Sequence, residues 1–333
     1  MPPQPDPAPV LDLIQAFRRS KTMFVAVSLG IFDRLAGNSK AAVDIRREDE
    51  NLDSLIRLLD ACVALGLLER EDEVYSNAAV AEAYLRRDSP TTMTGYIQYS
   101  DNVLYQLWGN LGDAVREGTH RWKQTFGADG PIFSQLYRTE ESMREFLLGM
   151  HGQGMLSAPL VAAAFDLSRF RRIVDLGGAT GHLAMAVAVR YPEMQAAVFD
   201  LPHVVEHSRP FVEGTRVELI GGDFFSDPLP PADLYALGRI VHDWAEDKIQ
   251  ALLARINAAL PSGGALLIAE SLLDDDLKGP VATHMQSLSM LLCTEGRERS
   301  FPQYAELLEQ AGFGKVEGKL TGSVVDAVLA VKL

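Results

Sequence analysis

The stretch LYALGRIVHDWAED, Leu234 to Asp247, begins as an apolar run and then places Arg239, His242 and Asp243 in quick succession. A histidine near a carboxylate, just past the end of a buried strand, can take a proton from a bound substrate. Asp243 has a second interpretation, because Asp caps helices and the following AEDKIQALLARINAAL has helical periodicity. This alternative accounts for the aspartate but leaves the histidine unexplained.

A glycine-rich turn lies upstream, in VDLGGATGHLA. Gly177, Gly178 and Gly181 stand between an expected strand and an expected helix, where a ligand can approach the backbone closely. The dinucleotide spacing of glycines and the Lys-Ser/Thr ending of a P-loop are both missing. Asp200 ends the next expected strand, where a carboxylate can accept hydrogen bonds from both hydroxyls of a ribose. The pattern therefore favours a nucleoside-containing cofactor other than a nicotinamide dinucleotide or ATP, with a tight turn and a capping Asp as the structural alternative.

From residue 170 onward, short apolar runs alternate with helical patterns. The runs RIVDLGG, QAAVFDLP, VELIGGDFF, DLYALGRIV and GALLIAESLL predict strands, and KVEGKLTGSVVDAVLAVKL is expected to close the chain with two more. This alternation is typical of an α/β fold with a mostly parallel sheet covered on both faces. We expect this domain to occupy residues 169–333.

The N-terminal part has a different character. Apolar residues recur at helical spacing from Val10 to Leu35, and a helix from Asp53 to Leu65 is followed by a turn at Gly66 and a strand pair. Helix, turn and hairpin in this order predict a winged helix over residues 1–95. We interpret it as a dimerisation domain, because the long apolar stretch exceeds what a small domain usually buries. Residues 96–168 are expected to be helical and to contribute to a substrate pocket.

Composition excludes several classes of function. A formal net charge of −14 disfavours binding to nucleic acid, whose phosphates attract basic surfaces. Apolar runs are too short to span a bilayer, and the Pro-rich start does not have the pattern of a signal peptide. The two cysteines, Cys62 and Cys293, are not in metal-binding spacing and suggest reduced thiols in a cytoplasmic protein.

Four motifs together carry a family resemblance. VDLGGATGHLA, FDLP, GGDFFSDPLP and GRIVHDW, in this order, resemble the S-adenosylmethionine-dependent small-molecule O-methyltransferases that include the plant caffeate and flavonoid enzymes. MQSLSMLLCTEGRERS and VVDAVLAVKL look most like the acetylserotonin O-methyltransferase branch. The resemblance covers nearly the whole chain. It implies a Rossmann-like class I methyltransferase domain with a seven-stranded sheet, an antiparallel last strand, a homodimer, and no metal. One departure is Ala179, where the family usually has a third loop glycine.

The resemblance also implies roles for individual residues. The cofactor would be held by Asp175, Gly177, Gly178, Asp200, Leu201, Gly222, Asp223, Phe224 and Arg239. His242 would be the general base, and the family's flanking acids match Glu270 and Glu298, while Asp243 stays between orienting acid and helix cap. The aromatic and methionine residues expected to line the substrate pocket are Tyr105, Trp108, Phe126, Met155, Met285 and Met290.

A base is needed because the acceptor hydroxyl is weakly acidic. A phenol has a pKa of ~10 and a free histidine ~6.5, so complete deprotonation before attack is uphill by about 3.5 units. A histidine that removes the proton as the new bond forms avoids the free phenolate. Two alternatives stay open. The first is an enzyme of the same fold that methylates nitrogen or carbon, or that catalyses a different reaction. The second is a ligand-sensing DNA-binding regulator built on the winged helix.

Overall fold

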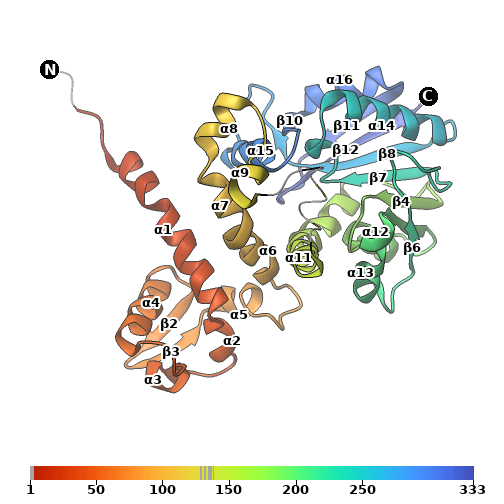
Figure 1. Ribbon diagram of the computed structural model, residues 1–333. Helices are drawn as coiled ribbons and strands as arrows, with labels where there is room; N and C mark the ends of the chain where they lie inside the picture. Colours follow the sequence, from red (N-terminus) through yellow and green to blue (C-terminus); the bar gives the residue numbers. More distant parts are fainter. Residues whose placement is uncertain (1–3, 128–129, 131–132, 134–136, 138) are drawn as a thin grey trace. The chain divides into compact units, whose positions relative to one another are not determined.

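The computed structural model describes residues 4–127, 130, 133, 137 and 139–333. The chain forms two compact units, Met1–Val103 and Leu104–Leu333 (Figure 1). Within the described residues no helix is both long enough and apolar enough to cross a bilayer.

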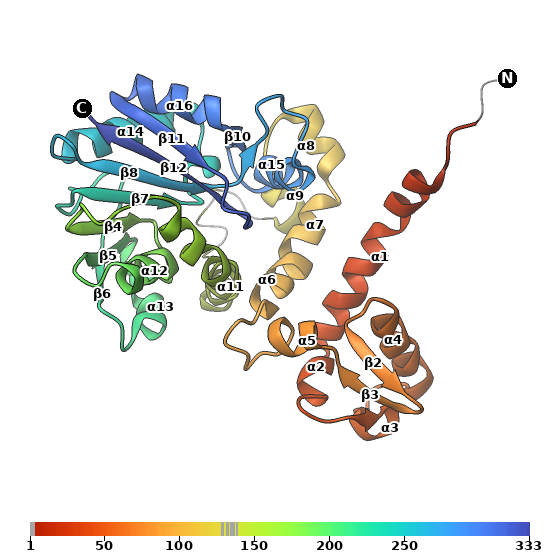
Figure 2. The same ribbon diagram turned by 180° about the vertical axis from the view of Figure 1, so that it is seen from behind.

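The first unit packs short helices around a small sheet. Its elements are α1 (Ala8–Ser28), α2 (Ile31–Arg34), β1 (Lys40–Ala41), α3 (Ala42–Ile45), α4 (Leu52–Ala64), β2 (Leu68–Glu71), β3 (Val74–Asn77), α5 (Ala79–Tyr84) and α6 (Thr94–Tyr99), followed by the π-helix η1 (Ser100–Leu104). The strand order is β1-β3-β2, and Figure 2 shows β2 and β3 beside α4. The expected helix, turn and hairpin are all present. The turn uses Gly66, whose φ of +70° is a conformation that costs glycine little.

The apolar stretch from Val10 to Leu35 does not form one continuous helix. Gly30, with a φ of +72°, separates α1 from α2. The second half enters the core of the unit, where Ile31, Phe32 and Leu35 are fully buried. The first half of α1 instead leaves large apolar side chains exposed, namely Val10, Leu11, Leu13, Ile14 and Phe17, each more than half accessible.

The second unit begins with helices and continues as an alternating α/β fold. Its first helices are α7 (Tyr105–Trp108), α8 (Leu111–Glu117), α9 (Trp122–Phe126) and α11 (Glu140–Ala164). The alternating part comprises β4 (Arg172–Leu176), α12 (His182–Arg190), β5 (Gln195–Asp200), α13 (Pro202–Val212), β6 (Val217–Gly221), β7 (Leu234–Gly238), the 3-10 turn η2 (Val241–Asp243), α14 (Glu246–Ala259), β8 (Ala265–Glu270), β9 (Leu272–Leu273), α15 (Val281–Cys293), β10 (Arg299–Ser300), α16 (Phe301–Gln310), β11 (Phe313–Lys319) and β12 (Asp326–Lys332).

Seven of these strands form the central sheet, in the order β11-β12-β8-β7-β4-β5-β6. The five strands from β8 to β6 are parallel, and β12 runs antiparallel to both of its neighbours. The prediction of an α/β fold with an antiparallel last strand is confirmed. One helix, α15, had not been anticipated, and the segment after it carries Glu298.

Helices cover both faces of the sheet. On one face, α11 and α12 pack onto Ile173, Leu234 and Leu267, and on the other α14 and α16 pack onto Val174, Tyr235 and Ile268. Figure 1 shows these two helical layers with the sheet between them. Because both faces are covered, the strands are apolar throughout, and polar side chains gather where the parallel strands end, at Asp175, Asp200 and Glu270.

Candidate active site

A cleft of about 280 Å³ opens at the carboxyl ends of the strands. Six of the residues that line it were predicted to hold a cofactor: Gly177, Asp200, Leu201, Gly222, Asp223 and Phe224. Five others were not predicted, and they add an aromatic and apolar wall: Phe133, Tyr137, Phe225, Ile240 and Trp244. Phe225, Ile240 and Trp244 stand in the quoted motifs, so the sequence did carry a signal for these three.

Asp200 joins the glycine loop to the end of β5. Its Oδ2 accepts a hydrogen bond from the backbone N–H of Ala179 at 2.9 Å, and its Oδ1 accepts one from Leu201 at 2.7 Å. Burial raises the pKa of Asp200 to about 6, although these two N–H donors oppose the shift. Each carboxylate oxygen has a second lone pair, so Asp200 can still accept hydrogen bonds from a ligand in the cleft.

Ala179 adopts a conformation that favours glycine. Its φ is +45°, in the left-handed region that side chains other than glycine enter at a cost of roughly 1 kcal/mol. The departure from the family pattern is therefore accommodated with backbone strain, and the N–H of Ala179 keeps its bond to Asp200.

Asp175 lies under the same loop. A Cβ at Gly178 would come within 2.6 Å of Oδ2 of Asp175, so the loop lies directly against this carboxyl group. Burial, with the nearby charge of Asp200, raises the pKa of Asp175 to about 8, and its Oδ1 has no hydrogen-bond partner. Neither Asp175 nor Asp200 forms an ion pair with a described residue, and two such buried carboxyl groups suit a ligand that brings positive charge or hydrogen-bond donors.

The remaining predicted cofactor residues lie at the adjacent strand ends. Oδ1 of Asp223 accepts the N–H of Phe225 at 2.8 Å, which shapes the GDFF turn. Arg239 follows β7 with a φ of +56°, and its N–H donates to the carbonyl oxygen of Ala269 at 3.0 Å. Asp175, Gly178 and Arg239 do not line the 280 Å³ cleft itself.

His242 lies in the 3-10 turn η2 that follows β7, and it is only 4% exposed. Its Nδ1 is 2.7 Å from Oε1 of Glu298 and 3.1 Å from Oε2 of Glu270. Its Nε2 is 3.7 Å from Oδ1 of Asp243, beyond hydrogen-bond distance. The structure therefore brings together all four residues that had been assigned to catalysis.

Glu270 shapes the turn as well as contacting the imidazole. Its Oε1 accepts hydrogen bonds from the backbone N–H groups of Ile240, Val241 and His242, at 3.0, 2.8 and 3.3 Å. These are the N–H groups at the start of η2, which have no partner within the turn itself. Asp243 does not cap the next helix, because α14 begins at Glu246 with Ala245 at its N-cap position.

The electrostatics of this cluster favour a protonated histidine. Burial by itself lowers the pKa of His242, but Glu270, Glu298 and Asp243 together outweigh it and raise the pKa to about 10. Burial in turn raises the pKa of Asp243 to about 6. Because the carboxylate of Glu298 can only accept a hydrogen bond, Nδ1 must donate to it, and the proton that is gained or lost then resides on Nε2. Neutral His242 is thus held in the tautomer whose Nε2 lone pair can accept a proton.

One atom each from His242, Glu270 and Glu298 lie within 4.8 Å of one another, a spacing that could also hold a metal ion. If Nδ1 of His242 carries a proton and donates it to Glu298, the same nitrogen cannot bind a metal ion, so this hydrogen bond competes with metal ligation.

The residues predicted to line a substrate pocket are spread over four helices. Nε1 of Trp108 donates to Oγ of Ser289 at 3.2 Å, which links α7 to α15. The rings of Phe126 and Trp122 are 5.5 Å apart on α9. Met290 is buried, whereas Tyr105, Met155 and Met285 are each about two-fifths exposed. Their role toward a substrate stays a prediction.

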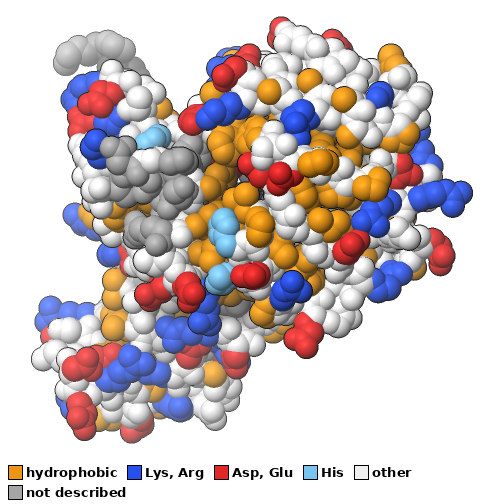
Figure 3. All heavy atoms as spheres, turned by 45° about the vertical axis from the view of Figure 1, so that its right-hand side comes forward, with side chains coloured by type: hydrophobic (Ala, Val, Ile, Leu, Met, Phe, Trp, Pro, Cys, Tyr) orange, Lys and Arg blue, Asp and Glu red, His pale blue; other side chains and the backbone are white. Residues whose placement is uncertain are grey.

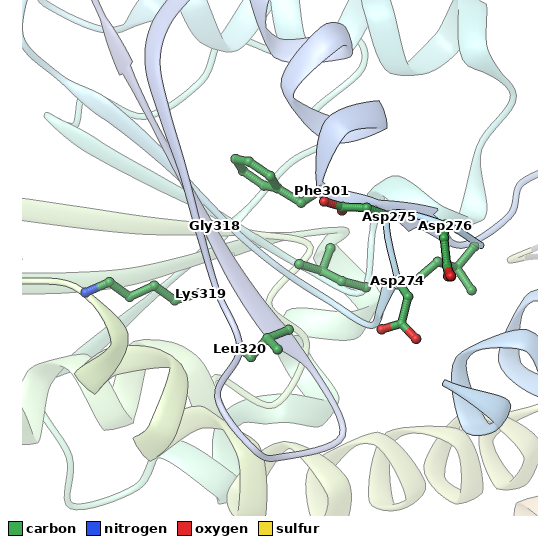
Figure 4. A pocket seen from close by; sticks show the side chains of 9 residues that line it. Asp274, Asp275, Asp276, Phe301, Gly318, Lys319 and Leu320 are labelled. Atoms are coloured by element: carbon green, nitrogen blue, oxygen red, sulfur yellow. The ribbon is translucent and has the colours of Figure 1, made fainter. Parts of the chain in front are cut away.

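A second pocket of about 590 Å³ lies between β9, the start of α16 and the end of β11. It contains no residue that had been predicted functional. Figure 4 shows Asp274, Asp275 and Asp276 on one side, Phe301 and Leu320 beside them, and Lys319 pointing away. Lys319 lies instead over the ring of Phe165, 4.9 Å from its centre.

Comparison with known proteins identifies the family. The family model of the O-methyltransferase domain matches residues 108–314, and that of the O-methyltransferase dimerisation domain matches residues 11–87. The chain belongs to the O-methyltransferase family.

Relatives of this O-methyltransferase align along almost its whole length. Acetylserotonin O-methyltransferase of Gallus gallus is 40% identical over 337 residues, which cover 98% of this chain and 97% of the relative. A probable bifunctional dTTP/UTP pyrophosphatase/methyltransferase protein of Homo sapiens is also 40% identical over 337 residues, but the match covers 99% of this chain and only 54% of that protein. The chain thus spans about half the length of the human relative.

A solved structure agrees with this assignment. The crystal structure of human N-acetylserotonin methyltransferase in complex with SAM has a TM-score of 0.94 and 38% identity, covering 100% of this chain and 99% of that one. The sequence-based prediction of the family and of an O-methyltransferase enzyme is confirmed.

Proposed function

We propose that this O-methyltransferase transfers a methyl group from S-adenosylmethionine to a hydroxyl group of a small aromatic molecule, with His242 as the general base. The observation that carries the proposal is the contact between Nδ1 of His242 and Glu298, because it leaves Nε2 as the proton acceptor. Its matched relatives named acetylserotonin O-methyltransferase support oxygen as the acceptor atom. The transfer to nitrogen or carbon remains the second candidate.

The cleft fits the chemistry of the cofactor. S-adenosylmethionine supplies an electrophilic methyl group on a positively charged sulfur, and its thioether leaves without needing a proton. Asp200 offers carboxylate oxygens to a ribose, Asp223 an acceptor to an adenine amine, and Phe224 an apolar surface to its ring. The six predicted residues in one cleft support this placement.

The raised pKa of His242 would make it a strong enough base to take the proton of the acceptor hydroxyl. The acidic neighbours raise the pKa of His242 to about 10, close to the pKa of ~10 of a phenol. Proton transfer between groups of matched pKa costs little, and the imidazolium that forms is stabilised by Glu298 and Glu270. The same neighbours keep His242 protonated at neutral pH, so its active neutral form becomes more abundant as the pH rises.

We propose that three parts of the chain have different roles. Residues 1–95 form a homodimer contact, residues 96–168 contribute pocket helices, and residues 169–333 bind the cofactor. The exposed apolar side chains of α1 support the first assignment. In the larger unit, hydrophobic side chains gather over the face drawn in Figure 3, and α11 exposes Leu148, Leu156 and Leu160.

We also propose that the protein is cytoplasmic, and the two buried free cysteines are consistent with this localisation.

The test is to incubate the protein with labelled S-adenosylmethionine and a pool of phenols, amines and activated carbon acids, and to identify the labelled product. We expect an aryl methyl ether, formed equally well with a chelator present. Labelled N- or C-methyl products would favour the second candidate. Loss of activity in the chelator, restored by one divalent metal, would assign the group formed by His242, Glu270 and Glu298 to a metal.

A further inference from the structure

The segment that carries Glu298 lies directly against the backbone of the turn that carries His242. At the point of contact stands Gly296. A Cβ built on Gly296 would lie 2.7 Å from the carbonyl carbon of His242 and 2.9 Å from the backbone nitrogen of Trp244, and closer still to the carbonyl oxygen of His242. Real side-chain carbons do not occur at such distances from backbone atoms.

The requirement for glycine is one of space alone. Gly296 is not among the described residues with a positive φ, so an alanine could adopt its backbone angles. All three atoms that a Cβ would meet belong to the backbone, and no rotamer change could relieve the contact. Any larger residue must therefore move the segment away from His242, or move His242 itself.

One hydrogen bond joins the two segments beside this contact, and two others hold the Glu298 segment itself. The N–H of Glu295 donates to the carbonyl oxygen of Asp243 at 3.1 Å, and the N–H of Gly296 donates to Oγ1 of Thr294 at 3.2 Å. Two residues further on, the N–H of Glu298 donates to Oγ of Ser287 at 3.3 Å. Glu298 lies only two residues after Gly296, so the position of its carboxylate depends on how closely Gly296 approaches the His242 turn.

We propose that Gly296 is a positioning residue for the reaction: its bare α-carbon lets the Glu298 segment lie against the His242 turn and so sets the contact between Nδ1 and Oε1. The catalytic consequence rests on the proposed role of His242 as base, whereas the geometric effect on the histidine does not. Moving Glu298 away removes a negative neighbour and lowers the pKa of His242.

His242 has other charged groups around it besides Glu298. Glu270 of β8 and Asp243 of η2 face the imidazole, and Arg239 lies near Asp243. Arg299 of β10 and the hydroxyl of Tyr304 on α16 lie near each other, and Tyr304 also lies near Glu270 and Glu298. The histidine should therefore keep a raised pKa in the variant, but a lower one than in the wild type.

The experiment compares Gly296→Ala with Gly112→Ala, a control glycine in α8 whose added Cβ would meet only the far end of Arg116, at 3.6 Å. The pKa of His242 is measured by NMR on the full chain with labelled histidine, with S-adenosylhomocysteine bound. We expect it to fall by about one unit in Gly296→Ala, since each lost carboxylate contact is of that order. Turnover should fall about tenfold on its high-pH plateau, where His242 is neutral in both proteins, while the Kd of S-adenosylmethionine changes less than about twofold.

A double-mutant cycle separates positioning from general damage. If Gly296 acts through Glu298, adding Gly296→Ala to Glu298→Gln should cause no further loss of turnover. Additive losses, or reduced turnover with an unchanged pKa of His242, would overturn the proposal. A shifted pKa with unchanged turnover would support the positioning by Gly296 and contradict the base role of His242.

A milder variant covers the case in which Gly296→Ala does not fold. Thr294→Val removes the oxygen that accepts the N–H of Gly296 and should lower the pKa of His242 in the same direction by less. An unchanged pKa in that variant would contradict the inference.

Discussion

Nδ1 of His242 lies 2.7 Å from Oε1 of Glu298, and both side chains are buried. The contact ties the end of one strand to a segment more than fifty residues later in the chain. It determines which imidazole nitrogen can accept a proton and raises the basicity of that nitrogen.

The first prediction concerns pH. Only neutral His242 can accept a proton, and its pKa is raised to about 10, so kcat/KM should rise with pH and reach half its maximum well above 6.5. Glu298→Gln removes one negative neighbour and should move the midpoint to lower pH. Since the mutation cannot change the acceptor's own ionisation, an unmoved midpoint would mean that the profile reports the substrate.

The second prediction concerns the cofactor. Asp200→Asn keeps the size of the side chain but removes its charge and one acceptor, so it should weaken the binding of S-adenosylmethionine by about 10- to 100-fold, or ~1.5 to 3 kcal/mol. Calorimetry measures the Kd directly. Asp275→Asn, an exposed aspartate outside the cleft, is the matched control. Equal affinity in the two variants would remove Asp200 from the cofactor site.

The third prediction concerns assembly. The wild type should have twice the 36.5 kDa mass of one chain by light scattering. Because Leu13 and Phe17 are exposed on α1, the double variant Leu13→Asp and Phe17→Asp should dissociate toward the monomer. Val189→Asp, at a still more exposed apolar residue of α12, should not dissociate the dimer. A wild type that is monomeric and fully active would contradict the dimer.

The fourth prediction concerns the stability of the first unit. Arg34 binds both oxygens of Glu50 at 2.6 and 2.8 Å, and its hydrogen bond, working against burial, lowers the pKa of Glu50 to about 2. A lowered pKa adds stability above pH 4.5 that is lost as the pH falls toward 2. Glu50→Gln should therefore destabilise the unit by ~2 kcal/mol at pH 7 and by less at pH 3. Urea unfolding measures this, with the exposed Glu48→Gln as control; a pH-independent difference would contradict the account.

Much of this architecture is predictable from the sequence, because strands buried on both faces are apolar and end in functional polar residues. Asp200 and Glu270 were found in this way, and His242 by its place after a strand. Long-range contacts are harder to predict. Only the family resemblance connected Glu298 to His242, since α15 and the segment after it show no strand pattern.

Three features escaped prediction for a physical reason. The three N–H groups held by Glu270, the strained φ of Ala179 and the close approach of Gly296 all depend on backbone positions set by tertiary packing. Side-chain type alone does not reveal them. Asp243 fits a helix cap by sequence, yet the chain makes an extra 3-10 turn before α14 begins.

The most direct test of the account is the turnover number of His242→Gln and His242→Ala, measured with a verified acceptor beside the Kd of S-adenosylmethionine. His207→Gln, at a histidine on α13 outside the cluster, is the matched control. The account predicts that both His242 variants lose ~10²-fold or more in turnover with nearly unchanged cofactor affinity, because a general base acts on the acceptor in the transition state. Near wild-type turnover in both variants would contradict it, and His242 would then be a structural residue at the end of β7.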